Sequence, residues 1–368
     1  MHIPDGFLAP GIWAGLDVSA ALSVTAVARR AQAGLEERQA PLLGVIGAFV
    51  FAAQMINFPI GVGTSGHLVG SALLACTLGP AAAAVVMTAI LVVQALVFQD
   101  GGVLALGANV MNMAVAGVLA GYLPYHYWGQ GPWRRAAIFL GGVLSVLVSA
   151  CLALAELLFS GVPMHGAVVG VSLLLFLVSA LVEGLITLAV VGSLEKMNPD
   201  WVRASTAVPS RVRGVLAAAA VLLASVGALA ASRLPDGLGK LAEELGIEGR
   251  ARTLLTTPLS GYQLQIDSTP WLRRIAAGLA GLAIIYAVCI GICRMMGSLR
   301  SAESAVRATK LAGNTRATAA DGSSVLRVFH KSVKGHEARL QTDEELRLRP
   351  RGAGSVLRVL LGRRKRSA

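Results

Sequence analysis

The stretch AAIFLGGVLSVLVSACLALAELLF, residues 136–159, has one carboxylate and no basic residue in 24 positions. A helix needs about 20 predominantly apolar residues to cross the hydrocarbon core of a bilayer, so this stretch is long enough to span it. Apolar stretches of the same kind occur at residues 42–56 and 81–98. The sequence therefore predicts an all-α polytopic membrane protein.

The composition of the whole chain supports this fold class. Of 368 residues, 55% are hydrophobic and 14% charged, and the mean hydropathy of +0.67 excludes a soluble globular protein. The 42 glycines fall mostly inside apolar stretches, as in closely packed membrane helices. The third predicted span is short and Gly-rich enough to dip into the bilayer without fully crossing it. We predict nine spans, near residues 8–28, 41–57, 67–79, 80–98, 103–121, 136–159, 167–192, 213–231 and 272–293.

The basic residues of the connecting loops predict the orientation, because Lys and Arg favour the cytoplasmic side. The loops after the second, fourth and sixth spans carry neither residue type. We therefore expect a cell (inner) membrane protein with its N-terminus outside and its C-terminus in the cytoplasm. The loops after the first, fifth and seventh spans carry Arg29, Arg30, Arg38, Arg134, Arg135, Lys196, Arg203, Arg211 and Arg213.

Three regions are predicted: a seven-span membrane module over residues 1–200, a two-span hairpin over 207–293, and a basic tail over 294–368. The tail has 17 Lys and Arg against 6 Asp and Glu, which accounts for nearly all of the formal net charge of +12. A basic cluster beside a membrane favours contact with anionic lipid, so nucleic acid is not expected as a partner. We assign no fold to the tail.

The first ten residues, MHIPDGFLAP, have the chemistry of a metal chelate. A free α-amine and the next amide nitrogen close a five-membered ring on an ion. Because residue two is histidine, its amide nitrogen and Nδ1 close a six-membered ring on the same ion. Three nearly coplanar nitrogens suit square-planar nickel(II) or copper(II) better than tetrahedral zinc. We expect Met1 to be retained, without a cleaved signal peptide ahead of the first span.

A fourth ligand is expected from the external loop NFPIGVGTSGHLVG, residues 57–70, where His67 follows a Gly-rich turn. Glycines allow another segment to approach the backbone closely. Asp5 is expected to cap the first helix or to bond an imidazole N–H as a supporting residue. On spacing alone, the alternative stays open that His2 is an ordinary terminal residue and His67 a polar helix start.

Three stretches resemble one family: MHIPDGFLAP, FVFAAQMINFPIGVGTSGHLVGSALLACTLGP (49–80) and QALVFQDGGVLALGANVMNM (94–113). Over about residues 1–200 the chain is similar to the cobalt/nickel substrate-binding component of energy-coupling factor (ECF) transporters, the CbiM/NikM type. The resemblance implies that the Met1 amine, the His2 amide and imidazole, and His67 bind the metal. It also implies a transmembrane coupling (T) protein and ATP-binding subunits as partners, and a supply of metal for cobalamin biosynthesis in some members.

The second module resembles a small accessory domain of the PDGLE type, through PDGLGKLAEELG (235–246) and TPLSGYQL (257–264). Gly239 stands where the family usually has glutamate, so a role for that carboxylate is not expected here. The apolar stripe Leu238, Leu241, Ala242 and Leu245 behind the Pro235–Asp236 cap predicts a short amphipathic helix. This helix either lies on the membrane or first module, or acts as a lid or loading aid for the metal site.

Polar side chains within apolar spans are candidates for functional residues because burying them is costly. We expect them to form hydrogen bonds between helices that fix the pocket, since amides are poor ligands for late transition metals. Glu183, in the middle of a span, is expected to serve packing or coupling. The supporting or pocket residues predicted beside Asp5 are Gln54, Asn57, Ser65, Gln94, Asn109 and Asn112.

The sequence lacks a GxxxxGK[ST] phosphate-binding loop, so other subunits must supply any ATP hydrolysis. No HExxH or Ser–His–Asp pattern suggests an enzyme, and no organic cofactor is expected. Two alternative functions are a metal-dependent membrane enzyme and a binding component for an organic vitamin. The second would require an aromatic pocket, yet only 5% of residues are aromatic. Cobalt(II) and nickel(II) are not distinguished.

Overall fold

The computed structural model describes residues 1–34, 39–61, 63–197, 209–232 and 234–318. The linker between the two predicted modules and most of the basic tail lie outside the described residues. The helices of the first module are α1 (Pro10–Gly34), α2 (Ala40–Gln54), α3 (Ser71–Leu78), α4 (Pro80–Val93), α5 (Leu106–Asn109), α6 (Val118–Trp128), α7 (Arg134–Phe159) and α8 (Gly166–Met197). They are followed by α9 (Ser210–Leu222), α10 (Ala228–Ala230), α11 (Gly237–Glu244) and α12 (Pro270–Thr318).

The membrane-spanning prediction is confirmed for seven of the nine spans. Among the described residues, seven helices are long and apolar enough to cross a membrane, five in the first module and two in the second. The other two predicted spans are shorter. Helix α2 has 15 residues and α3 has 8, so at about 1.5 Å per residue neither reaches across a core of about 30 Å.

Helix α2 is apolar although it is too short to span, and this fits its position inside the protein, where 13 of its residues are buried. The π-helical segment Gln94–Phe98 extends α4, and the two together form the spanning helix Pro80–Phe98. The π-helical segment Val110–Gly117 joins α5 to α6, and the three together form the spanning helix Leu106–Trp128. The chain is a multi-pass helical membrane protein, and residues Met1–Arg300 form one compact unit.

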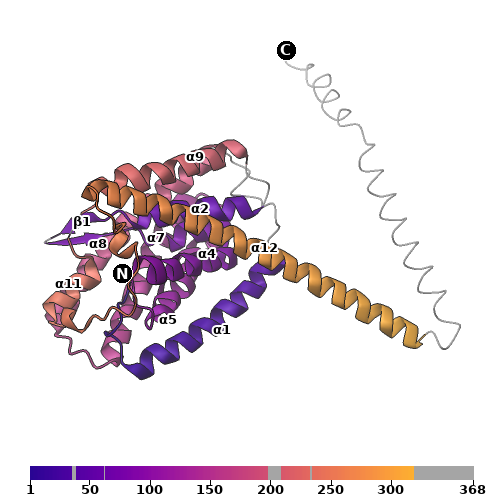
Figure 1. Ribbon diagram of the computed structural model, residues 1–368, viewed down its shortest axis with the longest axis horizontal. Coiled ribbons are helices and arrows are strands. Elements are labelled where there is room, and N and C mark those ends of the chain that lie inside the picture. The colour runs from indigo at the N-terminus through magenta and orange to yellow at the C-terminus, as the bar shows by residue number, and fades with distance from the viewer. Residues whose placement is uncertain (35–38, 62, 198–208, 233, 319–368) are drawn as a thin grey trace, which may run out of the picture. The chain divides into compact units, whose positions relative to one another are not determined.

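The Gly-rich turn predicted before His67 is a short antiparallel ribbon. Strands β1 (Phe58–Gly61) and β2 (Thr64–Gly66) pair with Phe58 opposite Gly66. The ribbon lies against α8, where a Cβ on Gly66 would come within 2.7 Å of the Ser179 Oγ. In Figure 1 the N-terminus, β1 and α11 lie at the same end of the helical bundle.

Helices α7 and α8 pack through small residues. A Cβ added to Gly142 would lie 2.7 Å from the Gly184 Cα and 3.1 Å from the Glu183 carbonyl oxygen. These are backbone atoms of α8, so neither can move away without shifting the helix. Close backbone contact of this kind stabilises helix pairs in membranes, where lipid removes the hydrophobic driving force between helices.

We predict that Gly142→Ala destabilises the protein by about 1–3 kcal/mol, because the added methyl forces α7 and α8 apart. The apparent Tm of the purified protein in detergent should fall. Gly170→Ala is the matched control within α8, since nothing lies within 4 Å of its Cβ position. Equal Tm values for the two variants would contradict close α7–α8 packing as a source of stability.

Candidate metal centre

The side-chain amide of Asn109 binds the backbone of the N-terminal segment on both sides. The Ile3 N–H donates to the Asn109 Oδ1 at 2.8 Å, and the Asn109 Nδ2 donates to the Ile3 carbonyl at 3.0 Å. The Gly102 N–H also donates to the Ile3 carbonyl, at 2.8 Å. With the Ile3 side chain fully buried, these bonds fix where Met1 and His2 lie.

The contacts of the Asp5 carboxylate differ from those that we expected. Its carboxylate accepts three backbone N–H groups, from Val103, Leu104 and Ala105, at 2.9, 2.7 and 3.1 Å. The prediction that Asp5 caps the first helix or bonds an imidazole is therefore wrong. Asp5 instead closes the turn before α5, about 100 residues away, and so braces the segment from the opposite side.

The α-amine of Met1 lies between two side chains. It donates to the His67 Nε2 at 2.7 Å and to the Asp236 Oδ2 at 2.6 Å. The His67 Nδ1 lies 3.0 Å from the Leu68 carbonyl, so a proton on Nδ1 leaves the Nε2 lone pair facing the amine. Burial alone would raise the pKa of Asp236, but the α-amine and His67 hold it well below its usual range.

The His2 ring stacks on the His67 ring, with centroids 5.5 Å apart and an interplanar angle of 8°. Its Nδ1 lies 3.3 Å from the Asp100 Oδ1, and its buried Nε2 has no hydrogen-bond partner in the described part of the chain. Burial lowers the pKa of His2 to about 4, so the ring is neutral at neutral pH. A neutral ring has a lone pair for a metal ion.

The predicted supporting residues mostly hold the loop that carries His67. The Gln54 Nε2 donates to the Val69 carbonyl at 2.7 Å, and the Gln94 Nε2 donates to the Gln54 Oε1 at 2.9 Å. Glu183 accepts the N–H groups of Val69 and Gly70 at 2.7 and 2.8 Å. Their observed contacts are those of residues that fix the pocket.

Two predicted residues lie apart from this loop. Asn112 donates to the Glu156 Oε2 at 2.9 Å. Asn57 lies elsewhere, with its carbonyl accepting the Ser232 N–H at 2.7 Å and its side chain lining a pocket of about 320 Å³.

Ser65 joins the ribbon to the second module. Its N–H donates to the Pro235 carbonyl at 2.8 Å and its Oγ to the Leu234 carbonyl at 2.7 Å. Helix α11 follows directly and buries Leu238 and Leu241 in one apolar cluster with Ile3. The amphipathic helix predicted from its apolar stripe therefore packs on the first module, in the same apolar cluster as the N-terminal segment.

Three residues at the site were not predicted: Asp100, Asp236 and Tyr262. The Tyr262 hydroxyl donates to the Asp100 Oδ2 at 2.5 Å and accepts from the Gln94 Nε2 at 3.2 Å. Asp236 was interpreted only as a helix cap, which it is, because its Oδ1 accepts the Gly239 N–H at 2.8 Å. Their contacts with the other residues of the site join positions at least 98 apart in the chain, so no local pattern indicates them.

Side chains alone do not form a metal site here. In the described ranges, no group of three or more His, Cys, Asp or Glu side chains is arranged to hold a metal ion. Main-chain nitrogens must therefore contribute if an ion binds. The amine and amide of the first two residues are the main-chain nitrogens beside His67, and each can bind a metal once it loses a proton.

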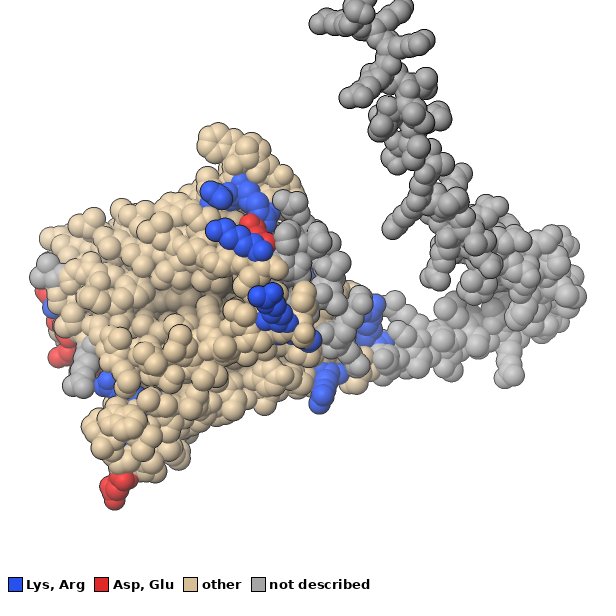
Figure 2. All heavy atoms as spheres, turned by 90° about the horizontal axis from the view of Figure 1, so that it is seen from above, with Lys and Arg blue, Asp and Glu red and all other residues tan. Residues whose placement is uncertain are grey.

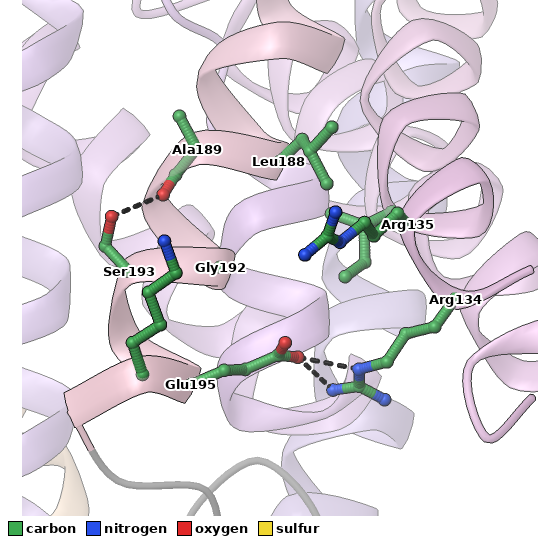
Figure 3. Close-up of a pocket in the computed structure, with 9 residues that line it drawn as sticks. Arg134, Arg135, Leu188, Ala189, Gly192, Ser193 and Glu195 are labelled. Carbon is green, nitrogen blue, oxygen red and sulfur yellow. Dashed lines mark hydrogen bonds and ion pairs between the residues drawn. The ribbon is translucent and has the colours of Figure 1, made fainter. Parts of the chain in front are cut away.

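A larger pocket, of about 540 Å³, lies where α7 begins and α8 ends. Figure 3 shows Arg134 paired with Glu195 in this pocket, with their Nε and Oε1 atoms 2.7 Å apart. Arg135 and Lys196 also line it and have no polar partner among the described residues. Figure 2 shows Lys and Arg gathered toward one end of the described part of the chain. The lining of this pocket includes none of the residues of the N-terminal site.

Comparison with known proteins gives two family matches. Residues 2–201 match the family described as the cobalt uptake substrate-specific transmembrane region, and residues 210–298 match the PDGLE domain. A chain from Archaeoglobus fulgidus, described as a fused nickel transport protein (NikMN), is 34% identical over 298 residues, which cover 80% of this chain and 98% of that one.

Two further comparisons cover about half of this chain. The cobalt transport protein CbiM of Thermosediminibacter oceani is 34% identical over 53% of this chain and 84% of its own length. A crystal structure of a transition metal transporter aligns with 54% of this chain and 93% of its own, with 32% identity and a TM-score of 0.49.

We predict that Asn109→Ala releases the N-terminal segment, because it removes both side-chain bonds to Ile3. At about 1 kcal/mol or more for each bond, hydrogen exchange of the N-terminal peptide should speed up by at least about tenfold, measured by mass spectrometry. Asn57→Ala, which has no contact with this segment, should leave the exchange unchanged. Equal exchange in both variants would show that Asn109 does not hold the N-terminus.

Proposed function

Because this chain belongs to the cobalt uptake substrate-specific transmembrane (CbiM) family, we propose that its N-terminal nitrogens capture one nickel(II) or cobalt(II) ion for import. It is a membrane transport protein rather than an enzyme. The ligands we propose are the Met1 amine, the His2 amide and Nδ1, and the His67 Nε2. The ion is the transported substrate and not a resident cofactor.

The observation that supports this ligand set best is the contact between the first and the last of these nitrogens. Two ligands at right angles, each about 2.0 Å from an ion, lie about 2.8 Å apart. The Met1 amine and the His67 Nε2 are 2.7 Å apart. In a planar complex these two are neighbours, because the amide nitrogen between the fused rings lies opposite His67.

Loading changes the contacts of the first two residues. The amine must give up a proton, and the His2 amide must lose its own. The His2 ring must turn its Nδ1 from Asp100 to the ion, which ends a contact of 3.3 Å. Both Asp100 and Asp236 are left as carboxylates beside a positively charged complex, where they favour binding.

We propose that the outer side of the membrane holds this site. The positive-inside rule then places the basic end seen in Figure 2 in the cytoplasm, together with residues 294–368. A tail with 17 Lys and Arg favours contact with anionic lipid there. ATP-binding subunits and a transmembrane coupling protein of the ECF type would drive release inward, since the sequence has no phosphate-binding loop of its own.

We expect one extra residue ahead of Met1 to abolish metal retention, because it turns the chelating amine into an ordinary amide. Nickel bound per protein would be measured by elemental analysis after purification, with the unmodified chain as the reference. The same residue added after Ala368 is the control. Retention of nickel by the N-terminally extended chain, with the fold intact, would rule out the chelate.

Binding should also release protons, because amine and amide nitrogens coordinate only after deprotonation. Calorimetric titration with nickel(II) in two buffers of different ionisation enthalpy should show more than one proton released per ion. Affinity should accordingly weaken as pH falls. Release of no proton would exclude the amide nitrogen as a ligand, even if the ion binds tightly.

A further inference from the structure

We propose that Asp236, from the second module, is a fifth ligand of the transported ion. This inference rests on the proposed function, since it takes the Met1, His2 and His67 ligands as given. It adds a carboxylate to four nitrogens and assigns a direct part in metal capture to the accessory module. The relevant atom is the Asp236 Oδ2.

The positions of three atoms support a shared ion. The Asp236 Oδ2 lies 2.6 Å from the Met1 amine and 3.7 Å from the His67 Nε2, and these two nitrogens are 2.7 Å apart. A triangle with these sides is small enough for one ion to lie about 2.1 Å from all three corners, a normal metal–ligand distance. The distances between these three atoms need not change for the ion to lie there.

The two oxygens of the Asp236 carboxylate have different partners. Its Oδ1 accepts the Gly239 N–H at 2.8 Å and so caps α11, while its Oδ2 points to the amine. Aspartate is a common N-cap residue, whose side chain accepts a backbone N–H from the first turn of the helix. The cap therefore fixes the rotation of the carboxylate and leaves a single oxygen for the ion.

The backbone that carries Asp236 is paired with the backbone that leads to His67. Ser65 in β2 forms a parallel bridge with Asp236, and its N–H donates to the Pro235 carbonyl at 2.8 Å. His67 follows two residues later in the same chain direction. On the other side of Asp236, a Cβ on Gly237 would lie 2.8 Å from the Phe176 ring, so α11 is pressed against α8. These contacts set the distance between the carboxylate and the imidazole before any ion arrives.

Charge also favours a carboxylate at this position. A doubly charged ion bound by one deprotonated amide and three neutral nitrogens keeps one positive charge. The side chains of Met1 and His67 at the site are largely buried, with His67 at 8% exposure, whereas Asp236 is 24% exposed. One carboxylate makes the complex neutral, which lowers the cost of holding a charge in a site with little water.

The test is X-ray absorption at the nickel edge of the full-length chain loaded with nickel(II) alone. Planar four-coordinate nickel(II) gives a distinct 1s→4p pre-edge feature, which a fifth ligand suppresses. We expect the feature to be weak in the unmodified chain and strong in Asp236→Asn. Asparagine keeps the helix cap through its Oδ1 but turns an NH2 group, which has no lone pair to offer, toward the ion.

Affinity supplies the second readout. Asp236→Asn should weaken nickel binding by at least about tenfold, whereas Asp267→Asn, an exposed carboxylate of the same loop, should leave both affinity and pre-edge feature unchanged. Thermal unfolding of each variant shows whether the fold is intact. An equally strong pre-edge feature in the unmodified chain and in Asp236→Asn would overturn the proposal.

The proposed function fails by a different result. If the chain extended ahead of Met1 still binds nickel like the unmodified chain, the N-terminal chelate is wrong, whatever Asp236 does. If that extension abolishes binding and the unmodified chain shows planar four-coordinate nickel, the chelate stands and only the role of Asp236 is overturned.

Discussion

The paired hydrogen bonds between the Asn109 amide and the backbone of Ile3 determine where the chain begins. A terminal segment is normally the least ordered part of a protein. Here the backbone of Ile3 is held by hydrogen bonds on both sides, and its side chain is fully buried. Only because of this does the Met1 amine reach His67, which is 66 positions away in the chain.

A second constraint explains the polar residues around this segment. Unpaired backbone N–H and carbonyl groups are costly within a membrane protein, so nearby side chains must pair with them. The loop from His67 to Gly70 is irregular and would leave its N–H and carbonyl groups unpaired. Glu183 accepts two of the N–H groups, and Gln54 donates to one carbonyl. These side chains hold the backbone beside His67 through their hydrogen bonds, as expected for polar groups buried between helices.

The sequence was a reliable guide to the helices and to the contact of Met1 with His67, and a poor guide to what surrounds them. A membrane span is recognised from the apolar character of about 20 consecutive residues, without knowing which helices pack against it. Seven long predicted spans therefore matched the structure. The role of Asp5 was wrong because a capping residue was assumed to serve the nearest helix, and it serves the turn at Val103.

Asp236 was missed for a similar reason, since a local cap already explained it. The ribbon of β1 and β2 was read as a turn because its glycines suggested no strand. The role of Met1, His2 and His67 as ligands, like the boundary between modules near residue 200, stays a prediction.

The backbone pairing of Ser65 with Pro235 has a consequence for why the two modules occur in one polypeptide. Covalent connection turns their docking into an intramolecular event, with an effective concentration that is on the order of millimolar for short flexible connections. A contact whose dissociation constant is about 1 mM, or about 4 kcal/mol, would then already be half formed. The buried residues of α9 and α12 share one apolar cluster with those of α2 and α4, so the single polypeptide keeps together an interface much larger than the pairing at Ser65.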